Sequence, residues 1–299
     1  MKQCFLFILA FFIATSFITA QKNEFRPIQA FSSGKTINAQ TTTMTGRGKM
    51  DFNVTHNFGD LAGSNGGIKR FFGLDNSTDV RIAFQVGITD KLDLGLARAK
   101  GAGPQQQLVE VSAKYLLLQQ REKDPSHPIS LAVFANAVVA ANTASNFPDQ
   151  DNSYSDLSDR ISNVFQLILS RKIGEISLQL NPTLLTRGYA ISYDQRTMFA
   201  LGGALRFPLA NKINLVLDYF HPFRSSSSKK AFETNNNFKF HDPLGIGFEF
   251  LTSGHVFRLN FTNATEILEN RFIPRTISSW GKGQFRWGFN ISRKFTLWR

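Results

Sequence analysis

The stretch Phe199-Ala200-Leu201-Gly202-Gly203-Ala204-Leu205-Arg206-Phe207 decides how this chain is expected to fold. Large apolar residues and the small Gly203 stand at every second position, and small residues or a single Arg stand between them. Because successive side chains of a β-strand point to opposite faces, the stretch predicts a strand with one apolar face and one small or polar face. An amphipathic helix would need an apolar repeat of about 3.6 residues, which is absent here.

The same alternation recurs along the chain, with eight further clear stretches and three less regular ones. Their second face is rich in Gly, Ala, Asn and Ser and carries single charges, whereas the outer face of a soluble sandwich would be densely charged. We therefore predict an all-β fold, a single antiparallel transmembrane β-barrel of about 12 strands. The clear stretches are 82–88, 92–97, 109–117, 176–181, 213–219, 244–250, 257–262 and 285–292, and the less regular ones lie near 50–58, 129–140 and 160–170.

The connections between these stretches alternate in length. Transmembrane barrels have short periplasmic turns and longer external loops. If the first strand rises from the periplasm, nearly all long connections fall outside, and an even strand number returns the C-terminus to the periplasm. The short connections are 89–91, 171–174, 208–212 and 252–255, and the long ones are 59–78, 141–159, 222–242 and 264–283.

The N-terminus has the pattern of a secretory signal peptide. Lys2 precedes a nearly unbroken apolar run at 5–17, and Thr19-Ala20 supplies small residues for cleavage. A membrane-anchor helix fits less well, because the run is short. We expect three parts: residues 1–20 as signal peptide, 21–48 as a periplasmic arm or plug or part of the first strand, and 49–299 as the barrel. Cys4 is the only cysteine, so the mature chain would have neither disulfides nor cysteine metal sites.

The chain is basic, with a formal net charge of +12. Its Lys and Arg residues are scattered, and an exported chain does not meet nucleic acid, so no nucleic-acid partner is expected. Attraction to outer-membrane lipid headgroups and to lipopolysaccharide phosphates explains the excess better. The barrel assembly machinery would be a partner during insertion into the outer membrane, and small solutes are possible ligands.

Short motifs spread over most of the mature chain resemble an uncharacterised outer-membrane β-barrel family of Gram-negative bacteria, a β-barrel domain of unknown function. The resemblance implies an architecture and no established activity. Family members usually carry an Arg where this chain has Asn57 and a His-Arg pair where it has Thr186-Arg187. The matching segments are 31–38, 50–59, 72–75, 86–92, 114–119 and 177–183.

Catalysis has weak support in the sequence. Outer-membrane phospholipase barrels use a His-x-Ser-Asn-Gly pattern, and this chain has Ser64-Asn65-Gly66 with the nearest His at His56, on a predicted strand. A nucleophile and its base must come within hydrogen-bond distance, which this spacing does not enforce. We expect a flexible turn there, no catalytic residues, no cofactor and no metal, since none of the five His residues has metal-ligand spacing. A lipid-active enzyme stays a remote alternative.

Alternation places charges of both signs on the inward face. Paired across strands they would fill and rigidify the interior, and separated on opposite walls they would set up a field across a water channel. Twelve strands lie between a packed barrel of about 8 and an open one of about 16. A narrow channel for small solutes and a structural or partner-binding barrel without a pore therefore both stay open. The predicted lumen-lining charges are Arg81, Asp93, Glu110, Lys114, Arg206, Asp218, Glu249, Arg258 and Arg286.

Overall fold

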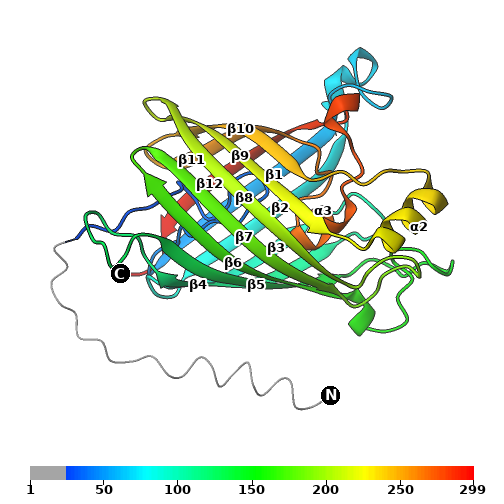
Figure 1. The fold of residues 1–299 in the computed structure, drawn as a ribbon, viewed down its shortest axis with the longest axis horizontal. Coiled ribbons are helices and arrows are strands. Elements are labelled where there is room, and N and C mark those ends of the chain that lie inside the picture. Colours follow the sequence, from blue (N-terminus) through cyan, green and yellow to red (C-terminus); the bar gives the residue numbers. More distant parts are fainter. Residues whose placement is uncertain (1–24) are drawn as a thin grey trace.

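The computed structural model describes residues 25–299 and shows a closed antiparallel barrel of twelve strands (Figure 1). Each strand pairs with its neighbours in chain order, and β1 pairs with β12 to close the wall. The prediction of an all-β barrel of about 12 strands is confirmed. The predicted signal peptide, residues 1–20, lies outside the described residues, as do residues 21–24.

The strands are β1 (Lys49–Asp60), β2 (Ser77–Gly87), β3 (Leu92–Ala99), β4 (Leu108–Leu118), β5 (Ser130–Ala140), β6 (Ile161–Ile173), β7 (Ile176–Arg187), β8 (Thr197–Ala210), β9 (Ile213–Phe223), β10 (Leu244–Leu251), β11 (His255–Thr262) and β12 (Arg286–Thr296). The helical elements are η1 (Ile68–Gly73), η2 (Ser158–Arg160), α2 (Ser226–Asn236), α3 (Glu269–Arg275) and η3 (Trp280–Lys282).

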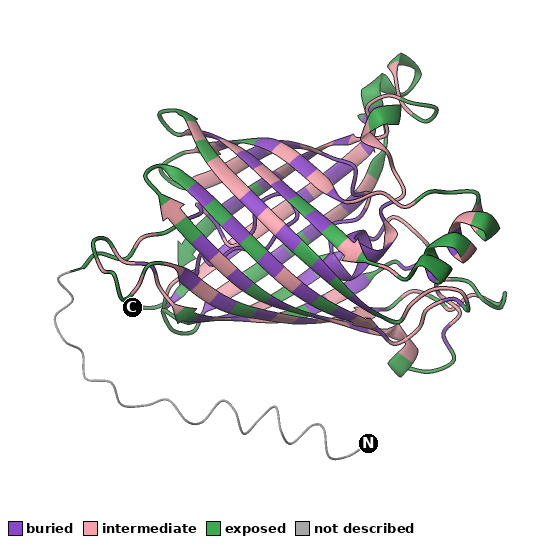
Figure 2. Cartoon of the chain, viewed as in Figure 1, coloured by how far each residue is buried: buried purple, intermediate pink, exposed green. Residues whose placement is uncertain are grey.

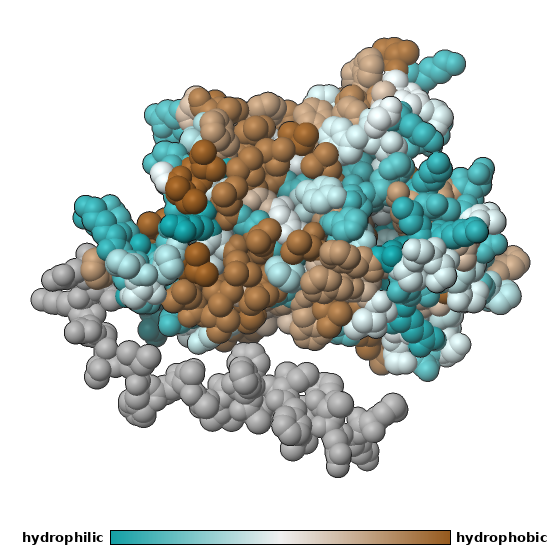
Figure 3. All heavy atoms as spheres, in the orientation of Figure 1, coloured by the Kyte–Doolittle hydropathy of each residue, from teal (hydrophilic) through white to brown (hydrophobic). Residues whose placement is uncertain are grey.

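The wall turns many large apolar residues outward, and its inward face carries most of the polar residues together with a smaller set of buried apolar ones. Leu178 and Leu180 of β7 are about half exposed, whereas their neighbours Gln179 and Asn181 are buried inside. Buried and exposed residues accordingly alternate along each strand (Figure 2), and apolar side chains gather over the outer face of the barrel (Figure 3). This inverts the arrangement of a soluble protein, and it suits a wall whose outer face meets hydrocarbon.

The two ends of the barrel differ. One, here called the turn end, carries the C-terminus and the four short connections; the other, the loop end, carries α2, α3 and the long connections (Figure 1). β6 and β8 run further than the sequence pattern indicates, so Ile173 and Pro208 belong to strands. Only Gly174 and Glu175 then join β6 to β7, and Gly174 has a φ of +57°, which glycine adopts without strain.

The helices were not predicted from the sequence. Within residues 25–299, no helix has the length and apolar character that crossing a membrane requires. α2 and α3 both belong to long loop-end connections, and their positions relative to the barrel differ. α2 lies outside the barrel mouth (Figure 1), whereas six of the seven residues of α3 are buried.

A charge on the outer face tests which medium that face meets. Leu180 is near the middle of β7 and 54% exposed. We expect Leu180→Arg to lower the free energy of unfolding in lipid vesicles by about 2–4 kcal/mol, because a cation there would face hydrocarbon. Urea-dependent folding into vesicles measures this difference. Leu157→Arg is the control, because Leu157 is 66% exposed in a loop-end connection. Equal stability of the two variants would contradict a lipid-facing wall.

Candidate functional site: the occupied lumen

Residues 30–45, here called the lumen segment, run through the barrel interior. All of them are buried except Ser32 and Gly34, which are partly buried. The segment is rich in Ser, Thr, Gly, Asn and Gln, and these short side chains suit the limited space within twelve strands. A cavity of about 30 Å³ beside Gly34 and Arg81 remains between the segment and the β1–β4 wall. That volume holds one or two water molecules, so a solute could not pass there.

The tip of the lumen segment is a tight turn that is bound to Asp218 of β9. The Thr36 N–H donates to the Ala39 carbonyl at 2.8 Å and closes the turn. The N–H groups of the three residues 37–39 then converge on Asp218 Oδ2, at 3.0, 2.7 and 3.2 Å. The Thr36 hydroxyl adds a fourth donor to this oxygen at 2.7 Å. Such converging backbone N–H groups form an anion-binding concavity, and they compensate a carboxylate that is only 1% exposed.

Polar wall groups hold the rest of the lumen segment. Lys114 Nζ donates to the carbonyls of Gly34 and Thr41, at 3.2 and 3.1 Å, and so bridges its two arms. Asp93 Oδ2 accepts from the backbone N–H and the hydroxyl of Thr45, at 2.9 and 3.0 Å. The Thr42 and Ser170 hydroxyls lie 2.5 Å apart. The anchoring groups come from distant strands, so the segment is held on several sides.

A second segment, residues 264–276, fills the loop end of the lumen and is here called the cap segment. It contains α3, and Phe272 packs edge-on against Phe220 of β9 with ring centroids 5.3 Å apart. The Ile267 N–H donates to Asp79 Oδ2 at 2.9 Å, which ties the segment to β2. Gly202 provides the space for Phe220, because a Cβ at Gly202 would stand 2.4 Å from that ring.

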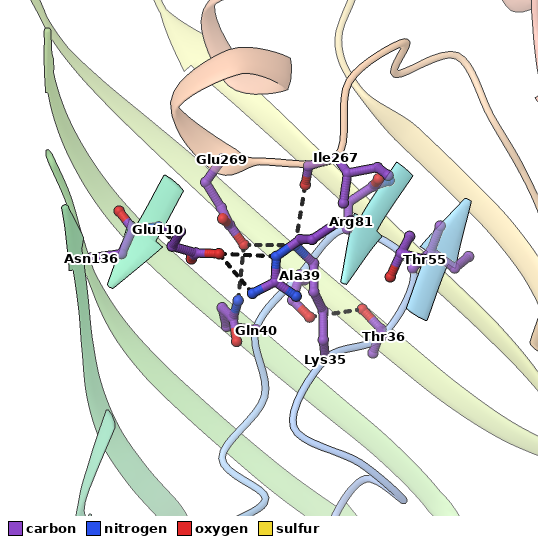
Figure 4. A network of polar contacts seen from close by, with 12 residues as sticks. Lys35, Thr36, Ala39, Gln40, Thr55, Arg81, Glu110, Asn136, Ile267 and Glu269 are labelled. Atoms are coloured by element: carbon purple, nitrogen blue, oxygen red, sulfur yellow. Dashed lines mark hydrogen bonds and ion pairs between the residues drawn. The ribbon is translucent and has the colours of Figure 1, made fainter. Parts of the chain in front are cut away.

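The lumen and cap segments meet inside the barrel through Lys35. Its Nζ lies 3.0 Å from Glu269 Oε1 and 3.2 Å from the Ile267 carbonyl oxygen, and Gln40 Nε2 donates to the same Glu269 oxygen at 3.1 Å (Figure 4). The Arg81–Glu110 ion pair lies in the same network. The two segments therefore close the lumen jointly.

All nine charges predicted to line the lumen point inward, and each is at least largely buried. Five of them form ion pairs with one another: Arg81 with Glu110 at 2.7 Å, and Glu249 with Arg206 at 3.2 Å and Arg258 at 2.5 Å.

The other four charges bind other groups. Arg286 pairs with Asp60 at 2.7 Å. Asp93 and Lys114 are opposite each other in the β3–β4 register, yet both bind the lumen segment, as does Asp218.

Sequence reasoning missed the charges that lie outside the alternating strands and, on the strands, the buried Asp51 and Asp79. Lys35 belongs to the lumen segment, and Glu266, Glu269 and Arg271 belong to the cap segment. Arg271 pairs with Glu266 at 2.8 Å. For the lumen segment, one available signal was the run of mostly short polar residues at 32–45, which lacks strand alternation and has Lys35 as its single charge.

The residues considered for catalysis or metal binding lie apart. His56 faces outward on β1 and lies 2.9 Å from the Ser77 hydroxyl, and the described residues show no hydrogen bond between Ser64 and a histidine. His221 Nδ1 lies 2.8 Å from Asp242. Residues 25–299 contain no cluster of three or more potential metal ligands.

Asp194 and the three arginines around it link several of the loop-end connections to one another. We call these four residues the loop clamp. Asp194 follows β7 and pairs with Arg187 at 3.0 Å, with Arg224 after β9, and with Arg275 of α3 at 3.6 Å. Burial alone would raise the pKa of the Asp194 carboxyl, but the three guanidinium groups hold that pKa below its usual value. The clamp ties the cap segment to the wall.

Removing the clamp carboxylate should open the loop end. Because the Asp194 pKa is lowered on folding, its contribution is complete above the ordinary carboxyl pKa of about 4 and is lost as the pH falls further. We expect Asp194→Asn to speed hydrogen exchange in residues 188–196 at pH 7, since Arg187 and Arg224 lose their acidic partner and Arg275 keeps only Asp151. Wild type should show this opening only at acid pH, below the ordinary carboxyl pKa. Unchanged exchange at pH 7 would contradict the clamp.

Three solved structures illustrate the likeness to known barrels. The KdgM porin matches with a TM-score of 0.47 and 9% identity, over 83% of this chain and 99% of that one. An outer-membrane channel from Pseudomonas putida F1 gives 0.44 and 11%, over 85% and 97%. The outer-membrane protein Omp33 of Acinetobacter baumannii gives 0.41 and 8%, over 84% and 100%.

No curated protein matches the sequence. The family model described as "Membrane bound beta barrel domain (DUF5777)" matches residues 31–295, which include most of the lumen segment and all but the last residue of the barrel wall. This agrees with the family resemblance found in the sequence motifs. The chain belongs to the family of membrane bound beta barrel domains.

Proposed function

We propose that this protein is an outer-membrane channel for small solutes that is closed at rest by its lumen segment. The predicted signal peptide would export the chain, and the turn end would face the periplasm, as the short turns of such barrels do. The chain has no catalytic role in this proposal. Its inward charges act instead on the solutes that pass once the lumen segment has moved.

The polar character of the lumen wall carries the proposal. The wall holds the lumen segment through hydrogen bonds with groups such as Lys114, Asp93 and Asp218. Apolar packing of Phe31 and Ala39 against the wall adds to these bonds. Water can replace the hydrogen-bond partners when the segment leaves, whereas an apolar interior would stay dry or collapse. The segment also lies N-terminal to β1, so it can move without breaking a strand pair.

A barrel without a pore is the second candidate, and the ion pairs within the lumen favour it. Glu249 is bound by Arg206 and Arg258, and such pairs rigidify an interior. The cap segment would also still occupy the loop end if the lumen segment left. These two candidates differ in one observable property, which is the current through the barrel after the occupying segments have been released.

Locking the lumen segment to the wall tests whether its movement opens the barrel. The Thr42 and Ser170 hydroxyls are 2.5 Å apart, so cysteines at both positions come within reach of a disulfide. Mature chain without its single Cys4 would contain no competing cysteine. We expect oxidised Thr42→Cys/Ser170→Cys protein to lose the opening events of wild type in planar bilayers, because the segment cannot leave. Reduction should restore them.

Each single cysteine variant is the control, since it changes the side chain without forming the lock. A deletion of residues 25–45 should give a small steady current, because the cap segment still occupies the loop end. A second variant, which lacks residues 25–45 and also has residues 266–273 replaced by a Gly-Ser linker, should give a larger current. If both deletion variants fold and neither carries a current, the channel proposal is contradicted and the barrel without a pore is the remaining candidate.

A further inference from the structure

A cavity of about 740 Å³ opens at the turn end, beside the start of the lumen path. Residues 25–30, the Thr42–Thr45 part of the lumen segment, and residues of β1, β4, β12 and two turns form its walls. Five cationic side chains line the cavity, which we call the basic vestibule, and Asp90 is its one lining carboxylate. The five are Arg26, Lys49, Lys91, Arg121 and Lys294.

Most of this positive charge has no acidic partner within residues 25–299. Arg121 lies 3.8 Å from Asp124, and the other four cations form no ion pair among the described residues, although Lys294 is opposite Asp51 in the β1–β12 register. Asp90 Oδ1 accepts from the backbone N–H of Arg47 at 3.1 Å, and this one lining carboxylate offsets only one of the five cations. The vestibule therefore has a net positive field, in contrast to the paired charges of the lumen.

The cations reach the vestibule from different elements. Asp51 of β1 is opposite Lys294 of β12, so Lys49, two residues before Asp51, lies on the same inward face. Lys91 comes from the β2–β3 turn, and Arg26 comes from the segment that precedes the lumen segment. Arg121 comes from the β4–β5 connection. Convergence from five separate elements around one hollow is a property of a binding site rather than of a scattered basic surface.

We propose that the basic vestibule binds a small polyvalent anion that carries carboxylate or phosphate groups. Its volume falls within the range of about 300–1,000 Å³ usual for ligand sites. Lysine and arginine are the groups that recognise these anions. A free solute and the headgroup of an anionic phospholipid share this chemistry, and either could occupy the site.

Occupancy would act on the lumen segment through Lys294. Its Nζ donates to the Met44 carbonyl at 3.2 Å and lies 3.5 Å from the Thr45 carbonyl. An anion attracts the ammonium group more strongly than a neutral carbonyl does, so a bound anion would draw Lys294 away from the segment. Anion binding in the vestibule does not require that the barrel conducts. A vestibule that binds no anion and a barrel that carries no current are therefore separate results.

Calorimetric titration of the mature protein in dodecyl maltoside with citrate tests the site. We expect saturable binding of citrate, none of glucose, and at least a tenfold weaker affinity for Lys49→Gln/Lys91→Gln/Lys294→Gln. The matched control is Lys69→Gln/Arg70→Gln, which removes two cations of η1 at the loop end and should bind citrate as wild type does. Circular dichroism confirms that each variant is folded, and Lys91→Glu alone replaces the triple variant if that one does not fold.

Two arms of the experiment separate the sources of the anion. In lipid nanodiscs, weaker citrate binding with phosphatidylglycerol than with phosphatidylcholine assigns the site to a lipid headgroup, and equal binding assigns it to a soluble anion. Both results support the vestibule. Absence of saturable citrate binding in detergent, or unchanged affinity in a folded triple variant or in Lys91→Glu, overturns the proposal.

Discussion

Lipid offers no hydrogen-bond partner to the backbone, and the whole structure depends on this constraint. A sheet within hydrocarbon must close on itself so that every N–H and C=O finds a partner, which the β1–β12 pairing achieves. Closure in turn assigns the two faces of each strand. The apolar face is outside and the polar face is enclosed, so the protein has to satisfy a large number of buried polar groups within a narrow space.

The lumen segment solves much of that problem. A buried carboxylate such as Asp218 is costly unless donors surround it, and the turn at 36–39 supplies three N–H groups and a hydroxyl. Lys114 has the opposite need and finds two backbone carbonyls of the same segment. The segment thus replaces water inside the wall, and the exchange can be reversed because water offers the same donors and acceptors.

Much of the wall could be predicted from the sequence, because lipid outside and a polar interior impose one two-residue pattern on stretches such as 199–207. Strand ends were harder to predict. Pro208 looked like a turn residue, but it pairs with Asn214 of β9 beside a register shift, which an irregular ladder tolerates. The inward direction of the nine charges followed from the alternation alone. Their partners did not, since Arg81 and Glu110 are on strands separated by β3.

The path of residues 30–45 could not be derived from local patterns, because it depends on groups far away in the chain. The sequence pattern identifies Asp93 and Asp218 only as separate inward charges. The closed barrel brings both of them to the lumen segment. Hydrogen exchange of the 37–39 amides in lipid nanodiscs tests that arrangement most directly. We expect these amides to exchange as slowly as those in the middle of β9. Exchange as fast as in an exposed loop would contradict a lumen closed by this segment.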